Sequence, residues 1–215
     1  MIFLAILLVK FLFPDFTTVK LTDLLLHPTK ENEWTCVKSN KGIQLYERWV
    51  QINDTLFVRE RKGELITNCS LKKTEDYLRD HSTVCDWMKG IKSAQSISTD
   101  SGQLVHMVIQ LPWPFSNRDL LARYHFYKID GKTSVVQVKS DKTVTMPDNR
   151  FIRIKHYVAT WRLEQINEQQ TKIVFETFSN EAPIFPQWIQ EPVLKKIFMS
   201  NLKRLKSRLS DSQTQ

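Results

Sequence analysis

Five histidines and three cysteines are the side chains of this 215-residue sequence best suited to acid–base, nucleophilic or metal chemistry. Their spacing matches no arrangement in which such groups act together: there is no HExxH helix, no G-x-S-x-G elbow and no zinc-deaminase signature. Five glycines leave no glycine-rich phosphate loop. Cys36, Cys69 and Cys85 are too few and too widely spaced for a zinc site, and their odd number argues against a disulfide framework. We therefore predict no metal, no cofactor and no catalytic residue.

Two of these side chains have a second interpretation. Cys85, beside Asp86, suits a buried helix position better than a nucleophile, because free cysteine behaves mostly as a small hydrophobe. His156 lies on an apolar strand face, where a histidine is most often a hydrogen-bonded part of the core. Inside a cavity, however, the same His156 would orient the polar end of a ligand.

Strands are predicted for most of the chain. Residues 43–50 and 56–66 combine aromatic and aliphatic side chains with interleaved charge, which is typical of strands. Between 91 and 180, apolar and polar residues alternate in runs separated by turn signals at 100–102, 130–132 and 147–149. Short turns between consecutive strands predict an antiparallel meander with one apolar face.

Alternate residues of these runs make up the apolar face. Periodicity does not distinguish a packed core from a cavity wall, because both need the same apolar side chains, so each position is a candidate for either. The candidate wall residues are Met107, Ile109, Leu111, Leu120, Ala122, Val136, Val138, Ile152, Ile154, His156, Phe175 and Thr177.

Two segments are predicted to be helical. Residues 70–90 carry leucines two turns apart, with Ser70 as N-cap and Gly90 as the stop. The C-terminal segment, with Pro186 and Pro192 in its first turns, has a wide apolar face opposite a basic one. Laying this helix across the sheet buries both apolar faces, so we predict an α+β fold. The residues expected to close the space beneath the helix are Trp188, Ile189, Val193, Ile197 and Phe198.

The N-terminus is treated apart from the domain, which we take to be residues 21–215. Residues 2–13 are apolar except for Lys10, and this length suits the core of an export signal within residues 1–20, although no basic segment precedes it. Export to a periplasm or out of the cell is the expectation. A retained membrane tether, or a core helix of a cytoplasmic protein, is the alternative.

A formal charge of +8 favours acidic partners. No nucleic-acid-binding motif is present, so nucleic acid is not expected to be the partner. Residues 192–210 contain six basic and no acidic side chains, which would suit transient contact with an anionic membrane surface. We expect a monomer.

Several stretches, in order, resemble the START (steroidogenic acute regulatory protein-related lipid-transfer) domains. These are Glu33-Trp34, 41–48 (KGIQLYER), 85–88 (CDWM), 111–119 (LPWPFSNRD) and 183–188 (PIFPQW), and the resemblance spans about residues 30 to 207. It implies a helix-grip fold, in which a curved antiparallel sheet and the long C-terminal helix enclose an apolar tunnel for one lipid.

Two details of the family bear on individual residues. Some sterol-binding members carry a charged pair inside the tunnel. Here residues 104–111 contain no acidic residue, and Arg123, the basic candidate, lies on the less apolar face of its strand. The trio Asn117, Arg118 and Asp119 is expected to fix its own loop rather than touch a ligand, because short Asn and Asp side chains readily bond nearby backbone.

The leading hypothesis is a non-catalytic lipid-binding or lipid-transfer protein. Burial of the ligand's hydrocarbon would supply the affinity, at about 0.8 kcal/mol per CH₂. The alternative is a cyclase or aromatase on a related cavity fold, with His156 or Arg123 polarising a reactive chain.

Overall fold

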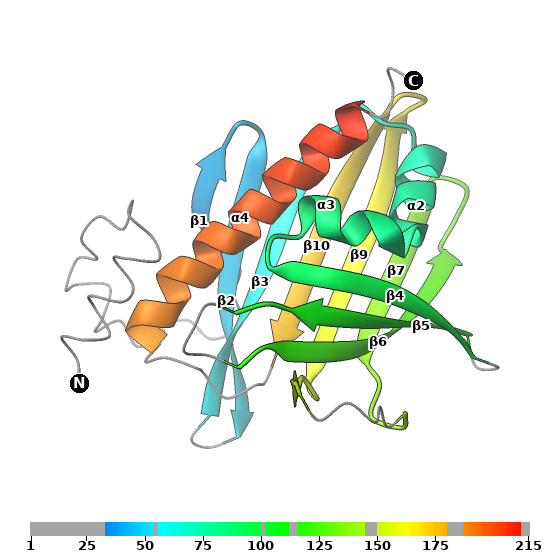
Figure 1. Cartoon of the computed structure of the whole chain (residues 1–215). Coiled ribbons are helices and arrows are strands. Elements are labelled where there is room, and N and C mark those ends of the chain that lie inside the picture. Colours follow the sequence, from blue (N-terminus) through cyan, green and yellow to red (C-terminus); the bar gives the residue numbers. More distant parts are fainter. Residues whose placement is uncertain are drawn as a thin grey trace.

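The computed structural model describes residues 33–53, 56–99, 102–111, 116–144, 150–179 and 187–211 (Figure 1). The apolar segment 2–13 and the expected export role of residues 1–20 lie outside these ranges. The elements, in chain order, are β1 (Thr35–Asn40), β2 (Ile43–Asn53), β3 (Leu56–Thr67), α2 (Leu71–Arg79), η2 (His81–Thr83), α3 (Val84–Trp87), β4 (Ile91–Thr99), β5 (Gly102–Ile109), β6 (Arg118–Lys128), β7 (Thr133–Ser140), β8 (Ile152–Arg153), β9 (Tyr157–Asn167), β10 (Gln170–Ser179) and α4 (Gln187–Asp211).

One sheet contains every described strand, in the order β1-β2-β3-β10-β9-β7-β6-β5-β4, with β8 pairing parallel to β6. All other neighbours are antiparallel, as the short turns predict. The sheet is not closed: β1 and β4 form its two edges. In Figure 1 it bends so that β4, β5 and β6 run across the direction of β2, β3 and β10, with α4 and the short helices in the concave side. This is the predicted helix-grip fold.

The helix predicted over 70–90 is interrupted. Ser70 caps α2 as expected, its hydroxyl accepting a hydrogen bond from the Lys73 N–H. The chain leaves the helix at Asp80, whose extended backbone ends α2 and whose carboxylate accepts from Ser82 N at 3.0 Å. A 3₁₀ turn and the single-turn α3 then follow before Gly90, which has a φ of +96° that suits glycine. The predicted helix is interrupted at Asp80, because the hydrogen bonding of its side chain to nearby backbone competes with continuation of the helix.

The predicted continuous strand over 151–163 is also broken. β8 ends at Arg153 and β9 begins at Tyr157, so the alternation predicted for 152–158 does not continue across the gap. In β9 the inward row is Ala159, Trp161 and Leu163, all buried, whereas Val158 is exposed. A change of partner causes the break, because β8 pairs with β6 whereas β9 pairs with β7 and β10.

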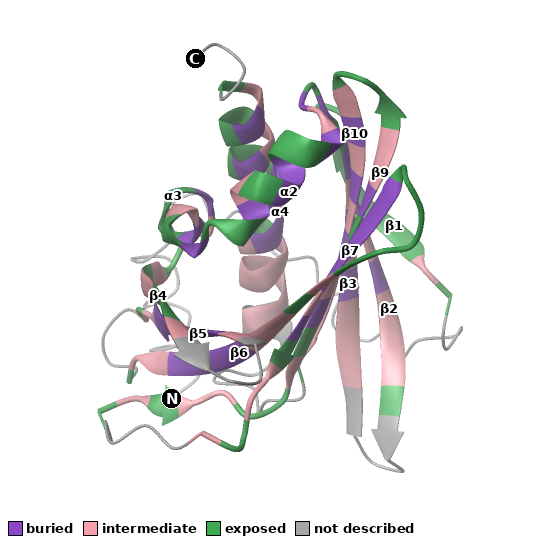
Figure 2. Cartoon of the chain, turned by 90° about the vertical axis from the view of Figure 1, so that its right-hand side faces the viewer, coloured by how far each residue is buried: buried purple, intermediate pink, exposed green. Residues whose placement is uncertain are grey.

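The main core lies between the inner face of the sheet and the C-terminal half of α4. Leu202, Leu205 and Leu209 of this helix are fully buried and pack in one cluster with Ile43, Leu45, Leu65, Leu163 and Ile173 of the sheet. Figure 2 shows the buried positions along β6, β7 and β10 and on the helices that face them. None of the described helices is long and apolar enough to cross a membrane.

Candidate functional site

A cavity lies beside the core, between the short helices α2–α3 and the inner face of strands β4 to β10. Its volume is about 740 Å³, part of which is open to solvent. Among the described residues its lining is Leu78, Thr83, Val84, Trp87, Met88, Ile91, Met107, Ile109, Leu120, Tyr124, Val136, Val138, Ile154, Tyr157, Ala159, Trp161 and Phe175. No Asp, Glu, His, Lys or Arg is in this set.

Seven of the candidate wall residues come together in this lining. They are Met107, Ile109, Leu120, Val136, Val138, Ile154 and Phe175, and they come from β5, β6, β7, β10 and the segment before β9. Their convergence follows from the register, in which β5 pairs with β6 and β6 with β7, so that alternate residues of each strand share the concave face.

The other candidates from the sheet lie elsewhere. Ile152 is 52% exposed and His156 is exposed, its Nδ1 lying 3.1 Å from Lys142 Nζ, so the prediction that they face the interior is wrong. Both errors have one cause, the break in the strand between Arg153 and Tyr157. Ala122 is fully buried in the packed core, and Leu111 and Thr177 are half-buried outside the lining.

Arg123 also points away from the cavity. Its guanidinium donates to Asp141 Oδ2, at 2.9 Å from Nε and 2.5 Å from a terminal nitrogen. Asp141 follows β7, and hydrogen bonds from the Thr143 hydroxyl and N–H, together with Arg123, lower its pKa to about 2 against the opposing effect of burial. This pair ties the end of β7 to β6 and is not a pair inside the tunnel.

The described part of α4 does not line the cavity. Phe198 is buried and stacks on Phe175 with ring centroids 5.4 Å apart, while Val193 and Ile197 are half-buried on the same helix. The side chains of Trp188 and Ile189 lie outside the described residues. The cover is instead α3 with its flanks, where Val84, Trp87 and Met88 face the strands.

Sequence reasoning missed this cover and most of the aromatic wall. Trp161 stacks on Phe175 with centroids 3.8 Å apart, and Trp87 meets Trp161 edge-on at 5.6 Å. Tyr124 and Phe126 belong to the alternating row of β6, so the period-2 pattern was sufficient to find Tyr124. The alternation pattern alone could not place Tyr157, Ala159 and Trp161 in the wall. The row predicted from Ile152 and Ile154 contains even-numbered residues, whereas these three are odd-numbered and face inwards only because the strand is broken.

The strand start at Asn117–Asp119 stabilises the site from outside. The Asn117 carboxamide oxygen accepts from Leu111 N at 3.0 Å, which closes the loop between β5 and β6. Asp119 is 1% exposed and accepts from Arg153 at 2.8 and 2.7 Å and pairs with His106 Nε2 at 2.9 Å. Burial of Asp119 opposes ionisation, but its bonds to Arg153 and His106 prevail and lower its pKa. These contacts hold β8 against β6 and so position Ile154 in the cavity wall.

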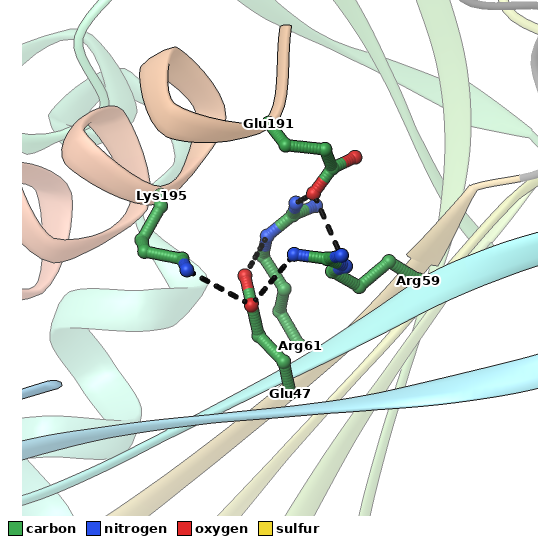
Figure 3. Close-up of polar contacts among 5 residues, drawn as sticks. All are labelled: Glu47, Arg59, Arg61, Glu191 and Lys195. Atoms are coloured by element: carbon green, nitrogen blue, oxygen red, sulfur yellow. Dashed lines mark hydrogen bonds and ion pairs between the residues drawn. The ribbon is translucent and has the colours of Figure 1, made fainter. Parts of the chain in front are cut away.

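An ionic cluster lies under the N-terminal half of α4 (Figure 3). Glu47 of β2 is 6% exposed and pairs with Arg59 at 3.0 Å, Arg61 at 3.1 Å and Lys195 at 3.2 Å. Glu191 of the helix pairs with the same two arginines. The helix is therefore attached to the sheet in two ways: leucines bury its C-terminal half, and ion pairs hold its N-terminal half.

A bent, open antiparallel sheet gripping a long C-terminal helix, with an apolar cavity beside it, defines a helix-grip protein. The START domain model matches residues 21–215, so the chain belongs to the START domain family.

Individual relatives are distant. Human phosphatidylcholine transfer protein is 21% identical over 161 residues, which cover 73% of this chain and 74% of the relative. The STAR-related lipid transfer protein of Xanthomonas axonopodis superposes with a TM-score of 0.71 at 23% identity, covering 82% of this chain and 98% of that one. The Zhui aromatase/cyclase of Streptomyces superposes with a TM-score of 0.52 at 12% identity, covering 70% and 93%. These similarities support a lipid-binding role, and both lipid-transfer proteins and a cyclase share the fold.

Proposed function

We propose that this protein is a non-catalytic carrier that holds one lipid in the cavity beneath α3 and moves it between membranes. The observation that carries the proposal is the chemistry of the lining. Its described side chains are aliphatic and aromatic, with hydroxyls only on Thr83, Tyr124 and Tyr157. Such a wall removes hydrocarbon from water, at about 0.8 kcal/mol per CH₂ group buried.

The same wall disfavours the cyclase alternative. General acid–base catalysis needs a group that titrates near the working pH. Burial raises the pKa of both Tyr124 and Tyr157 further above the ordinary value of 10.0, so neither hydroxyl is a base at neutral pH. His156 and Arg123, the groups expected to polarise a reactive chain, both lie outside the described lining. No described cavity residue would therefore act as a general base at neutral pH.

Membrane contact is part of the proposal. Lys203, Arg204 and Arg208 are exposed on the face of α4 opposite its buried leucines. An anionic bilayer would attract this face, bringing the carrier to the surface from which it takes its ligand.

Mass spectrometry of the organic extract of the purified protein tests the carrier function. A stoichiometric lipid in the extract, and transfer of a labelled lipid between donor and acceptor vesicles at a rate proportional to protein concentration, are the expected results. Chemical conversion of a bound polyketide-like chain, with no lipid retained or transferred, would favour the cyclase instead.

A further inference from the structure

The polar groups of the cavity wall narrow the class of lipid, provided that the protein is the carrier proposed above. Among the lining residues with a side-chain N–H or O–H group, Thr83 and Tyr157 are already engaged. The Thr83 hydroxyl donates to Asp80 O at 2.8 Å and lies 3.2 Å from Tyr77 O. The Tyr157 hydroxyl interacts with Thr177.

The side-chain donors of Trp87 and Tyr124 have no partner among the described residues. Trp87 is 3% exposed, and its Nε1 is buried with no hydrogen-bond acceptor. Tyr124 is half-buried in the cavity wall, and no hydrogen bond joins its hydroxyl to a described residue. A buried donor without an acceptor costs about 1–3 kcal/mol. A cavity wall with one such donor on Trp87 and an unpartnered hydroxyl on Tyr124 is suited to a ligand that supplies acceptors.

Tyr124 is held firmly enough to act as an anchor. Its ring packs edge-on against His81 with centroids 4.4 Å apart and stacks on Phe126 at 6.2 Å. His81 is itself buried, and its Nδ1 lies 3.1 Å from Gln103 Nε2 and 3.4 Å from Ser96 Oγ. Burial lowers the pKa of His81, so this neighbour is neutral at physiological pH and adds no cation to the wall.

We infer that the ligand is an electrically neutral lipid that places an uncharged oxygen, of an ester, ketone or hydroxyl group, against the Tyr124 hydroxyl and the Trp87 indole N–H. A carboxylate or phosphate in the same place would be buried with no cation among the described lining residues to pair with it, and burying an unpaired charge costs far more than a neutral hydrogen bond returns. Neutral oxygens match the two donors without that cost.

Fluorescence titration with matched polyene probes tests the inference on the full chain. Parinaric acid at pH 8 carries a carboxylate, its methyl ester carries a neutral oxygen pair on the same chain, and diphenylhexatriene carries no oxygen. The ester is expected to bind at least about tenfold more tightly than the ionised acid, because only the acid would bring a charge into the wall.

Tyr124→Phe separates hydrogen bonding from packing. The variant should weaken binding of the ester by about two- to tenfold and leave binding of diphenylhexatriene unchanged. The melting temperature of the ligand-free protein should stay the same, because the hydroxyl has no hydrogen-bond partner within the described protein. Tyr127→Phe, at a tyrosine that is 48% exposed, is the matched control and should change nothing.

Each of the other possible results would contradict one part of the inference. Equal or tighter binding of the acid would overturn the neutral class of ligand. If Tyr124→Phe weakened binding of the ester and of diphenylhexatriene equally, or weakened neither, Tyr124 would not be the polar anchor. Failure of the wild-type protein to bind any of the three probes would contradict the carrier function itself, and the inference with it.

Discussion

Gly63 lies directly beneath Leu202, where α4 crosses β3. A Cβ atom at Gly63 would overlap Leu202 Cδ1 and come within 3.0 Å of Phe198 Cε1. Because Leu202 is 1% exposed and packed on all sides, it has little room to withdraw. The missing side chain therefore sets how closely the helix approaches the sheet.

Gly63→Ala should consequently destabilise the fold by about 1–3 kcal/mol, the usual cost of overpacking a core. Thermal or urea unfolding measures the change. Gly131→Ala is the matched control, because nothing lies within 4 Å of a Cβ atom there, and it should be neutral. Equal stability of the two variants would show that α4 is not packed tightly on Gly63.

Ile154→Trp should block lipid uptake while the fold survives. Ile154 lines the cavity, so an indole there occupies space that the ligand needs rather than space filled by protein. Uptake of a fluorescent lipid and ligand-free melting are measured together. Ile152→Trp, two residues away at a 52% exposed position, should leave uptake unchanged. A drop in ligand-free stability of about 1–3 kcal/mol for Ile154→Trp would instead indicate a solid core.

Glu47→Gln should loosen the N-terminal half of α4. The substitution leaves Arg59, Arg61 and Lys195 with only Glu191 as a counter-charge in the cluster, and removing one partner of a buried pair typically costs about 3–5 kcal/mol. Hydrogen exchange should rise in residues 190–197 and stay slow in 202–209, which leucines hold. Glu164→Gln, in an exposed pair with Arg162, should have no such effect. Uniform exchange along α4 would contradict the two modes of attachment.

The fold should lose stability in acid partly through Asp141. Its pKa falls from 3.8 to about 2 in the folded protein, so the carboxylate stabilises the fold above about pH 4. That contribution disappears as pH falls from about 4 towards 2, where the folded state also takes up the proton. Unfolding measured across this range should show a shallower dependence on pH in Asp141→Asn. An unchanged slope would remove Asp141 from the acid response.

Charge reversal on α4 should weaken binding to anionic vesicles. Each Lys or Arg near an anionic surface contributes about 1 kcal/mol, so Lys203→Glu, Arg204→Glu and Arg208→Glu together should reduce binding strongly at low salt. Reversing Lys128, Lys132 and Lys139 gives the same net charge on the β6–β7 hairpin, away from α4, and is the control. An equal loss of vesicle binding in the two triple variants would exclude a role for this face of α4. Equal binding of the unmodified protein to neutral and anionic vesicles would exclude it as well.

Local pattern in the sequence was sufficient for most of the elements and for seven of the 17 described residues that line the cavity. Alternation along 104–109 and 118–126 specified which side chains of β5 and β6 face inwards, because successive residues of a strand point to opposite faces. The leucines at 202, 205 and 209 specified the buried side of α4 for the equivalent helical reason. Asn117 and Asp119 also contact backbone and side chains near the start of β6, as short polar side chains predict.

Tertiary structure alone decided the remainder, because it depends on pairings between distant residues. Nothing near Arg61 indicates that its partner is Glu191, 130 residues away. The gap between Arg153 and Tyr157 arises because β8 pairs with β6 while β9 pairs with β7, and a break in a strand reverses which residues face the cavity. The chain passes from β3 to the far edge of the sheet through α2 and α3, and this crossing puts Trp87 over the cavity. Periodicity describes one element at a time, whereas a cavity exists only between elements.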